Sequence, residues 1–426
     1  MTFFFLLILV FFMPFEVDLR HQGINLPVIN TSLEILFVLL LAAWLAERIK
    51  RKDYRLKATA LDIPILIFLV WHIVSGMFSV NVAWSLKYIF KMFAGIIFYY
   101  IIIDTVKEEK QLKKIVLSLL FSAVIVGALG IGERLIPGSL KNILDVFCPG
   151  HFYLPESFTI RAKSTFIYPN IFAMYLEMVI FIASGLLFGR FLRFPAFVLL
   201  LTAEALMLTY SRGGLIAVYG ALALLLCLST GREFLKVKRR NIFFIGITIT
   251  GLFLLTMVFD NVLARRVGSV FDKSYNANRE RVYLWKCAVE MIKARPLTGV
   301  GPDGYRWVYD DKYAVSSPFS SLTNPGGIPS ANSNNMYLEM AANLGIPGAL
   351  MFLWVLISIV NCQLKWFKKQ EAEYSLNVFM GLSAGIWAFY IHGLVDSFWQ
   401  FQSIILLFWL ITGLTVLIAS GRYKCA

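Results

Sequence analysis

The sequence predicts an all-α polytopic membrane protein with about twelve transmembrane helices and one large outer loop that contains short helices. Three observations favour this fold class: 58% of the 426 residues are hydrophobic, only 15% are charged, and the charged residues cluster between long apolar runs. A water-soluble domain carries roughly a quarter charged residues, whereas apolar runs of about 20 residues suit helices that cross a bilayer. Secreted, nucleic-acid-binding and disordered classes of protein are therefore excluded, although the net charge is +14.

Twelve apolar runs can be read along the chain, with boundaries good to a few residues. The first six are Thr2 to Phe15, Ser32 to Ala46, Ile63 to Val80, Leu86 to Ile103, Ile115 to Ile131 and Ile167 to Phe188. The second six are Pro195 to Tyr210, Leu215 to Leu228, Ile242 to Phe259, Met336 to Val360, Leu376 to Val395 and Ile404 to Ala419. The first run has no basic segment before it and no small-residue cleavage site before Glu16, so we read it as a helix and not as a signal peptide.

The distribution of Lys and Arg predicts the orientation of these helices. Basic residues follow every even-numbered run, in the segments 48–57, 107–114, 190–193, 232–240, 365–369 and 422–424. Short loops rich in Lys and Arg remain on the cytoplasmic side. Both termini are therefore expected in the cytoplasm, and two long connections, Glu133 to Tyr168 and Asp260 to Asn334, are expected on the outer side.

Three parts of the chain follow from this topology: 1–259 with the first nine helices and the connection 133–168, 260–334 as the large outer loop, and 335–426 with the last three. Inside the loop, Val282, Trp285, Val289 and Ile292 recur at helical spacing and predict an amphipathic helix that Pro296 ends. The glycine-dense stretch from Thr298 to Gly304 follows it. This stretch is either an ordinary tight turn or a turn whose free N–H groups face an anion.

The tenth run is too long for one straight span. Asn335 to Gln363 would measure about 43 Å as a helix, against a hydrocarbon core of roughly 30 Å. Because proline and glycine break helices, Gly345-Ile-Pro-Gly348 is the natural break. We expect a short helix from about Asn335 to Leu344 at the outer surface, followed by the span itself.

Several cations are expected to meet at one outer cavity. They are Arg212 in the turn between two helices, Lys87 and Lys91 on one face of the fourth helix, Arg279, Arg281 and Lys286 on the loop helix, and Arg161 and Lys163 in the first long connection. Arg212 alone could be a lipid anchor. Together the arginines suit a diphosphate, because guanidinium binds phosphate oxygens with two parallel hydrogen bonds. Lys91 needs a partner inside the bilayer, and Glu177 or Glu204 is expected to supply it.

Three stretches of the sequence resemble the O-antigen ligase and O-antigen polymerase superfamily. They are Ser211-Arg-Gly-Gly214, then Arg281-Val-Tyr-Leu-Trp285 followed by Arg295-Pro-Leu-Thr-Gly-Val-Gly301, and finally Asn334-Asn-Met-Tyr-Leu-Glu339 leading to Gly345-Ile-Pro-Gly348. Together they cover about 140 residues, in an order and on a predicted side that agree with the family. Members of this superfamily are bacterial inner-membrane proteins that transfer a glycan from undecaprenyl diphosphate on the periplasmic side.

The resemblance implies an inverting, metal-independent glycosyl transfer that needs no cofactor. Arg212 and Arg281 then hold the diphosphate. The family's closing motif begins with a histidine thought to activate the acceptor hydroxyl, and here that position is Asn334, which can orient a hydroxyl but cannot take its proton. Either proton removal is late and unassisted, or another residue is the base, or the acceptor differs. The candidate bases are Glu339, Asp303, His392 and Asp396.

Other polar residues near the closing motif are expected to contact substrate, namely Asn335 and Tyr337 in the motif and His392 and Asp396 at the outer end of the eleventh helix. The last two are four residues apart, a spacing that permits a hydrogen bond and a purely structural role. Glu339 could likewise be a structural residue that caps a neighbouring helix or pairs with a cation.

The first functional hypothesis is an O-antigen ligase that moves a glycan from undecaprenyl diphosphate to lipid A core. Its alternatives within the superfamily use a growing glycan or a protein hydroxyl as the acceptor. A transporter of the same lipid-linked glycan is a more distant alternative, because no internal repeat is visible. An adaptor without catalytic activity would explain Asn334 directly. Membrane lipids are expected to contact the chain, and nucleic acid is not.

Overall fold

The computed structural model describes residues 1–24, 29–136, 138–147, 161–189, 193–230, 239–269, 272, 276–313, 332–367 and 373–421. Parts of both long outer connections, and most basic residues predicted after the sixth, eighth and tenth runs and at the tail, lie outside these residues. The helices up to the middle of the chain are α1 (Thr2–Phe12), η1 (Leu19–Gln22), α2 (Ser32–Arg51), α3 (Asp62–Met77), α4 (Val82–Thr105), α5 (Glu109–Leu135), α6 (Lys141–Phe147) and α8 (Pro169–Gly189).

The second half continues with α9 (Arg193–Leu208), α10 (Arg212–Thr230), α11 (Arg239–Phe259), α12 (Asn261–Gly268), α13 (Asn276–Ala294), α14 (Tyr305–Val308), η4 (Tyr309–Tyr313), α15 (Met336–Phe367), α16 (Glu373–His392) and α17 (Gln402–Ala419). Each of the twelve predicted apolar runs coincides with one of these helices. Apart from an isolated bridge between Asp18 and Thr31, the described residues form no β-structure.

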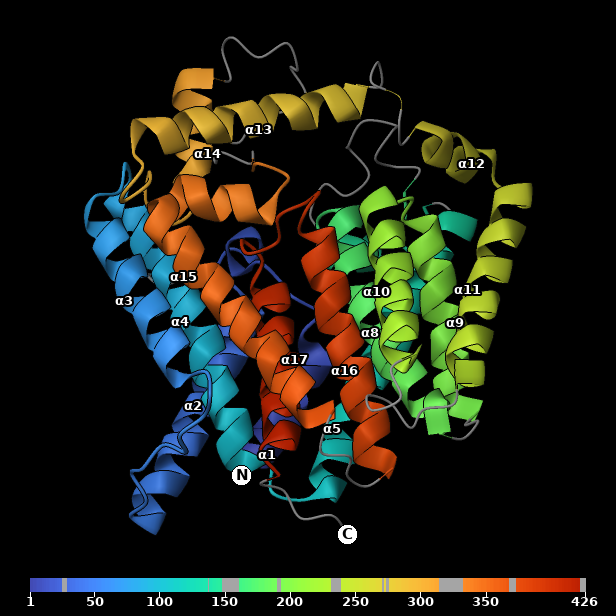
Figure 1. Ribbon diagram of the computed structural model, residues 1–426, viewed down its shortest axis with the longest axis horizontal. Helices are drawn as coiled ribbons and strands as arrows, with labels where there is room; N and C mark the ends of the chain where they lie inside the picture. The colour runs from blue at the N-terminus through green and yellow to red at the C-terminus, as the bar shows by residue number, and fades with distance from the viewer. Residues whose placement is uncertain are drawn as a thin grey trace.

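The chain is an all-α, multi-pass membrane protein. In the described residues, seven helices (α4, α5, α8, α10, α11, α15 and α17) are long and apolar enough to cross a membrane, and α1 and α3 are shorter apolar helices. Crossing of the bilayer by all twelve remains a prediction. Figure 1 shows the long helices side by side in one bundle, with α12, α13 and α14 across one end and the start of α1 and the end of α17 at the other.

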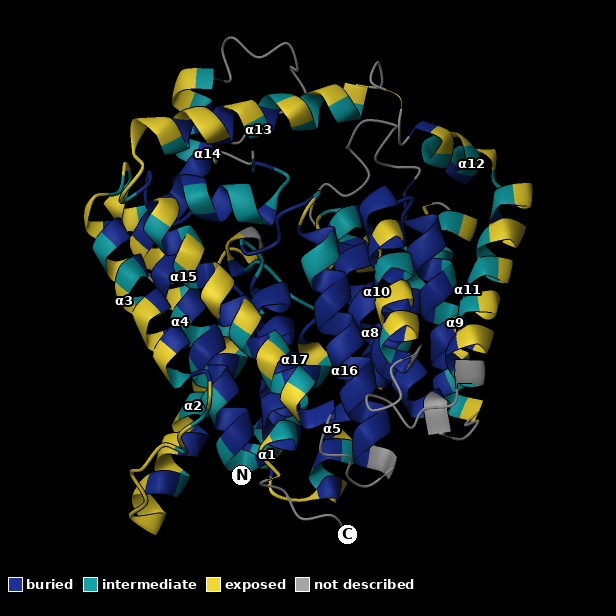
Figure 2. Ribbon diagram, in the orientation of Figure 1, coloured by how far each residue is buried: buried dark blue, intermediate teal, exposed yellow. Residues whose placement is uncertain are grey.

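Helices α8, α16 and α17 form the centre of the bundle, and α11 lies at its edge (Figure 2). The apolar window of α8 is 89% buried, against 22% for α11. Glycines let α8 and α16 approach closely: a Cβ added to Gly185 would lie 2.4 Å from the carbonyl oxygen of Asn377. Small residues at such contacts are typical of helix packing in membranes, and the exposed apolar side chains of α11 suit contact with lipid.

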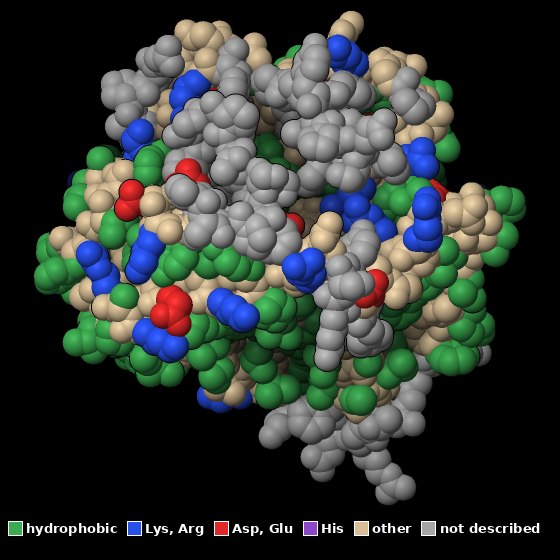
Figure 3. Space-filling model, turned by 90° about the horizontal axis from the view of Figure 1, so that it is seen from above, with side chains coloured by type: hydrophobic (Ala, Val, Ile, Leu, Met, Phe, Trp, Pro, Cys, Tyr) green, Lys and Arg blue, Asp and Glu red, His purple; other side chains and the backbone are tan. Residues whose placement is uncertain are grey.

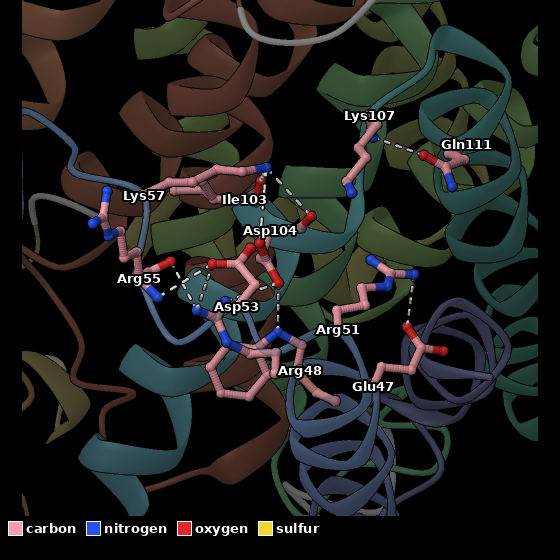
Figure 4. A network of polar contacts seen from close by, with 11 residues as sticks. Glu47, Arg48, Arg51, Asp53, Arg55, Lys57, Ile103, Asp104, Lys107 and Gln111 are labelled. Carbon is pink, nitrogen blue, oxygen red and sulfur yellow. Dashed lines mark hydrogen bonds and ion pairs between the residues drawn. The ribbon is translucent and has the colours of Figure 1, made fainter.

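A polar network joins α2 and α4 at the end of the bundle opposite α13 (Figure 4). The Asp104 carboxylate lies 3.1 Å from Arg48 Nη1 and accepts a hydrogen bond of 2.9 Å from Trp44 Nε1. Lys57 Nζ is 3.8 Å from the same carboxylate. The Arg48 side chain is only 8% exposed, so its charge depends on Asp104 for compensation.

The predicted break in the tenth run is confirmed. Gly345 has φ 72° and ψ 178° inside α15, a conformation that interrupts the helix and that a side chain would strain. The first part of α15 lies across the end of the bundle and the second part runs down its side (Figure 1). A Cβ on Gly345 would also lie 2.1 Å from the Leu297 carbonyl oxygen, so the loop packs directly on the break.

The glycine-dense stretch 298–304 is a structural turn. Its Val300 and Gly301 N–H groups donate to the carbonyls of Ala342 and Asn343, both at 2.9 Å. The Val300 carbonyl accepts from the N–H of Val80 after α3 at 3.0 Å. The tight-turn interpretation therefore fits better than an anion site, because these donors are already used within the protein.

The loop helix α13 ends before Pro296 as predicted, but the apolar stripe read from the sequence is not the one that the helix buries most deeply. Val282 and Val289 are 46% and 38% exposed, whereas the residues that the helix buries are Leu284, Cys287, Ala288 and Met291. This second stripe packs with Ala342 on the first part of α15. Periodicity identified the helix, but the neighbouring helix decided which of two adjacent stripes became the core.

Candidate functional site

The turn Ser211–Gly214 places Arg212 at the first position of α10. Tyr210 has a positive φ of 50°, and the Ser211 N–H donates to Thr209 Oγ1 at 3.1 Å, which reverses the chain after α9. The Arg212 side chain is buried and points into the protein. It donates to the Ser269 carbonyl at 3.0 Å and to Asn278 Oδ1 at 2.8 Å. Arg212 therefore joins α10 to the loop helices, which is not how a lipid anchor behaves.

Arg281 lies on α13 and makes no hydrogen bond or ion pair with any described residue, and its Nε atom is buried without a partner. Its charge acts on Arg161, His392 and Asp396. An arginine donor that is buried and unpaired is costly. Arg281 Nε is therefore a donor that no described residue uses.

Four arginines gather at this end of the bundle. Burial lowers the pKa of Arg161 to about 9, and the like charges of Arg266, Arg281 and Arg212 act in the same direction, while Asp396 opposes them. Figure 3 looks onto the α13 end, where Lys and Arg side chains gather beside a hollow near the middle of the face. We call Arg161, Arg212, Arg266 and Arg281 the arginine cluster. Its excess of positive charge fits a ligand with several negative oxygens.

Asp396 is held beside the arginine cluster by Asn170 at the start of α8. Asn170 Nδ2 donates to Asp396 Oδ2 at 2.5 Å, and Asn170 Oδ1 accepts from Arg161 Nη2 at 2.6 Å. Burial raises the pKa of Asp396, and the positive charge of Arg281 works against this rise. A carboxylate with a raised pKa is a better proton acceptor.

The expected side-chain pair of His392 and Asp396 does not form. Helix α16 ends at His392, so Asp396 lies beyond the helix, where four-residue spacing no longer brings side chains together. His392 Nδ1 instead lies 2.9 Å from Glu177 Oε2 in α8, and both side chains are fully buried. His392 Nε2 has no hydrogen-bond partner among the described residues.

In the closing motif, the side-chain amide of Asn334 makes no hydrogen bond with the described residues, whereas the side chains of Asn335 and Tyr337 are structural. Asn334 has φ 48°, its carbonyl accepts from Trp285 Nε1 at 3.3 Å, and its side chain makes no hydrogen bond with the described residues. Asn335 Oδ1 caps α15 by accepting from the N–H groups of Tyr337 and Leu338. The Tyr337 hydroxyl donates to the Tyr390 carbonyl at 2.9 Å. Asn335 and Tyr337 therefore use these groups to shape the motif, and their contact with substrate stays a prediction.

Glu339 is buried under the same motif. Its Oε2 accepts from the Ser333 N–H at 3.0 Å, and its Oε1 accepts from Gln400 Nε2 at 2.9 Å. These bonds tie the segment before Asn334 to the connection before α17. Glu339 thus fixes a loop, and the expected ion pair with a cation does not form within the described residues.

Lys87 and Lys91 do not join the arginine cluster. They line a separate cavity of about 370 Å³ together with Arg306 and Asp303. Lys91 pairs with neither expected partner, because Glu177 is bonded to His392 and Glu204 Oε2 accepts from Thr256 at 3.1 Å. The carboxylate that Lys91 influences is Glu16, in the same cavity. The cations expected to meet at one outer cavity therefore lie at two neighbouring sites.

Arg279 also stands apart, because it is exposed on α13. Conversely, Arg266, Asn170 and Arg306 were not predicted from the sequence. The Arg306 guanidinium lies 3.1 Å from Asp303. Arg266 could have been found, because it belongs to an Arg-Arg pair at the start of the large loop. Asn170 carried no such signal, since its role depends on where α8 begins relative to α16.

Comparisons with known proteins give one family match. Residues 196–353 match the family model described as O-antigen ligase, a range that includes the Ser211 turn, α13 and the closing motif. No curated protein matches the chain. The three stretches that carried the resemblance in the sequence therefore all lie inside the matched range, and this part of the chain is similar to the O-antigen ligase family.

Proposed function

We propose that this protein is an O-antigen ligase-like, inverting and metal-independent glycosyltransferase. It moves a glycan from undecaprenyl diphosphate to lipid A core on the periplasmic face of the bacterial inner membrane, with both termini in the cytoplasm. The observation that carries this proposal is Arg281, whose Nε atom is buried without a hydrogen-bond partner, beside three further arginines. A diphosphate supplies the negative oxygens that this group lacks.

The arginine cluster provides the main catalytic effect in this proposal. Arg281 and Arg212 bind the diphosphate and stabilise the charge that develops on it as the glycosidic bond breaks. Arg212 is already held by Ser269 and Asn278, so one arm of the site is rigid before the donor binds. Fixed donors of this kind need no rearrangement during the reaction.

The transfer itself is a single displacement at the anomeric carbon. The acceptor oxygen forms the new bond on the face opposite the diphosphate. The old bond breaks with its electron pair on the diphosphate oxygen, so the configuration inverts. Asn334 orients the acceptor hydroxyl through its free amide. We assign the hydroxyl proton to Asp396, whose surroundings include Arg281 and Arg161, and we assign to Glu339 the positioning of the segment that carries Asn334.

Deletion of the gene in its host tests the proposal. Lipid A core without polymer, together with accumulation of lipid-linked polymer, is the expected result for a ligase. Core that carries a single repeat unit would instead indicate a polymerase, and unchanged lipopolysaccharide with an unglycosylated protein would indicate a protein O-oligosaccharyltransferase. Unchanged lipopolysaccharide and unchanged protein glycosylation would contradict the assignment to glycan transfer.

A further inference from the structure

The cavity that contains Lys87 and Lys91 lies at the same end of the bundle as the arginine cluster. It measures about 370 Å³ and is bounded by the first turns of α4, the segment 165–171 and the residues 400–403 before and in α17. A volume of this size is in the usual range for small-ligand sites. The proposed diphosphate site uses none of its lining residues.

The lining combines aromatic rings with planar polar groups. Trp84, Tyr168 and Phe401 contribute rings, while Glu16 and Gln400 contribute a carboxylate and an amide. A sugar ring presents a face of C–H groups, which packs on an aromatic ring, and hydroxyls, which both donate and accept hydrogen bonds. The composition of the cavity therefore suits a saccharide better than an acyl chain.

Two of the four basic residues in the lining remain available to a ligand. Arg20 lies 2.6 Å from Asp18, and Arg306 lies 3.1 Å from Asp303. Lys87 and Lys91, one turn apart on α4, make no hydrogen bond or ion pair with the described residues. Lys87 Nζ lies 5.9 Å from the centroid of the Trp84 ring, and the charge of Lys91 acts on Glu16. Lysine ammonium groups bind phosphate as point charges. The saccharide should therefore carry a negatively charged group.

The cavity and the arginine cluster lie on opposite sides of one helical turn. Tyr168 and Ile171 line the cavity, whereas Asn170 between them bonds to Arg161 and Asp396. Gln400 lines the cavity and also donates to Glu339 under the closing motif. A ligand in the cavity is thus adjacent both to the proposed diphosphate site and to the residues that support Asn334.

We propose that this cavity binds the acceptor as an anionic saccharide, with Lys87 and Lys91 contacting its phosphate or carboxylate. The inference rests on the proposed function, because it assigns the second substrate of the same reaction. The arginine cluster then serves the donor and the cavity serves the acceptor. Variants of the arginine cluster should weaken binding of the donor, whereas variants of the cavity should weaken binding of the acceptor.

Binding to the full-length protein in detergent tests this assignment. The probe is core oligosaccharide released from the host lipopolysaccharide, used intact, dephosphorylated or carboxyl-reduced, and the measurement is isothermal titration calorimetry. The double variant Lys87→Gln, Lys91→Gln should bind intact core at least about tenfold more weakly. Lys293→Gln is the matched control, because this lysine is exposed on α13 and pairs with Glu290. It should bind core like the wild type.

The modified probes identify the anionic group. The wild type should lose affinity for core when the group that the lysines contact is removed, whereas the double variant should be insensitive to that removal. Equal affinity of wild type and double variant for intact core would overturn the proposal, as would absence of core binding to the folded wild type. Core binding as expected, without transfer from an undecaprenyl diphosphate donor, would instead refute the proposed function and leave the cavity assignment standing.

Discussion

Gly213 lies directly against the imidazole ring of His392: a Cβ atom added to Gly213 would fall 2.6 Å from Nε2. The ring is fixed from its other side by Glu177, and both side chains are fully buried. The first glycine of the Ser211 turn therefore lets α10 approach α16 next to Arg212. Its role is to leave space for a neighbouring side chain.

Replacement of Gly213 by Ala should destabilise the protein by about 1–3 kcal/mol, the usual range for overpacking in a core. Glycan transfer should fall as well, because the displaced turn carries Arg212. The measurement is the thermal unfolding temperature in detergent. Gly246→Ala in α11 is the control, since nothing lies within 4 Å of its added Cβ. Equal unfolding temperatures for the two variants would contradict the observed contact.

Replacement of Arg281 by Lys should abolish glycan transfer and leave the fold intact. A lysine keeps the charge but cannot offer two parallel hydrogen bonds to a diphosphate. Transfer is measured with purified protein and lipid-linked donor, and folding by thermal unfolding. Lys293→Gln on the same helix should retain activity. Normal transfer by Arg281→Lys would refute the role of Arg281.

The pH dependence of transfer should reveal Asp396. A proton acceptor must be deprotonated, so activity should fall as pH decreases through the pKa of Asp396, which burial raises. The acidic limb should therefore lie above the ordinary carboxyl pKa of about 4. Arg161→Gln removes a charge that lowers this pKa, so it should move the limb to higher pH. An unchanged limb in Asp396→Asn would exclude Asp396 as the base.

Glu339→Gln separates positioning from proton transfer. If Glu339 holds the segment before Asn334, turnover falls because the Gln amide cannot accept from both Ser333 and Gln400, and the acidic limb keeps its position. If Glu339 is the base, turnover falls by about a hundredfold or more and the limb disappears. An unchanged rate would rule out both roles.

Asn334→His should preserve activity or increase it. The φ of 48° at this position is one that Asn and His adopt more readily than most residues, so the fold should tolerate the change. An imidazole would add a group that titrates near pH 6.5, visible as a new step in the pH profile. Asn334→Val is the comparison, and its β-branched side chain should destabilise the motif. Loss of activity in Asn334→His would show that the amide itself is required.

Asp104→Asn should destabilise the protein by about 3 kcal/mol, because it leaves the buried charge of Arg48 without its partner. Activity per folded molecule should not change, since this network lies at the end opposite α13. Asp53→Asn is the matched control: the Asp53 side chain is 60% exposed and 4.0 Å from Arg48, so the change should cost less than about 1 kcal/mol. Thermal unfolding of both variants checks the difference.

Local chemistry explains which features could be predicted from the sequence. Apolar runs, the break at Gly345 and the end of α13 before Pro296 depend on residues close together in the chain. The convergence of Arg161, Arg212 and Arg281 could also be predicted, because the topology read from the sequence placed all three at one end of the bundle.

Features that depend on tertiary partners could not be predicted. The pairing of His392 with Glu177 requires α8 and α16 to be in contact at one register, and this pairing removed the expected partner of Lys91. The separation of the lysines from the arginine cluster depends on the single turn of α8 that contains Asn170. No spacing in the sequence reports either arrangement.

The turn 298–304 has a mechanical consequence. Its hydrogen bonds to Val80, Ala342 and Asn343 attach the segment after α13 to the top of α3 and to the kinked α15, whereas Arg212 belongs to α10. A change in the tilt of α3 or α15 would therefore act on the hydrogen bond between Arg212 and Asn278 of α13, which sets the spacing of Arg212 and Arg281. Because helices tilt to match bilayer thickness, turnover in vesicles should vary with acyl-chain length, which would make the surrounding lipid a determinant of the reaction rate.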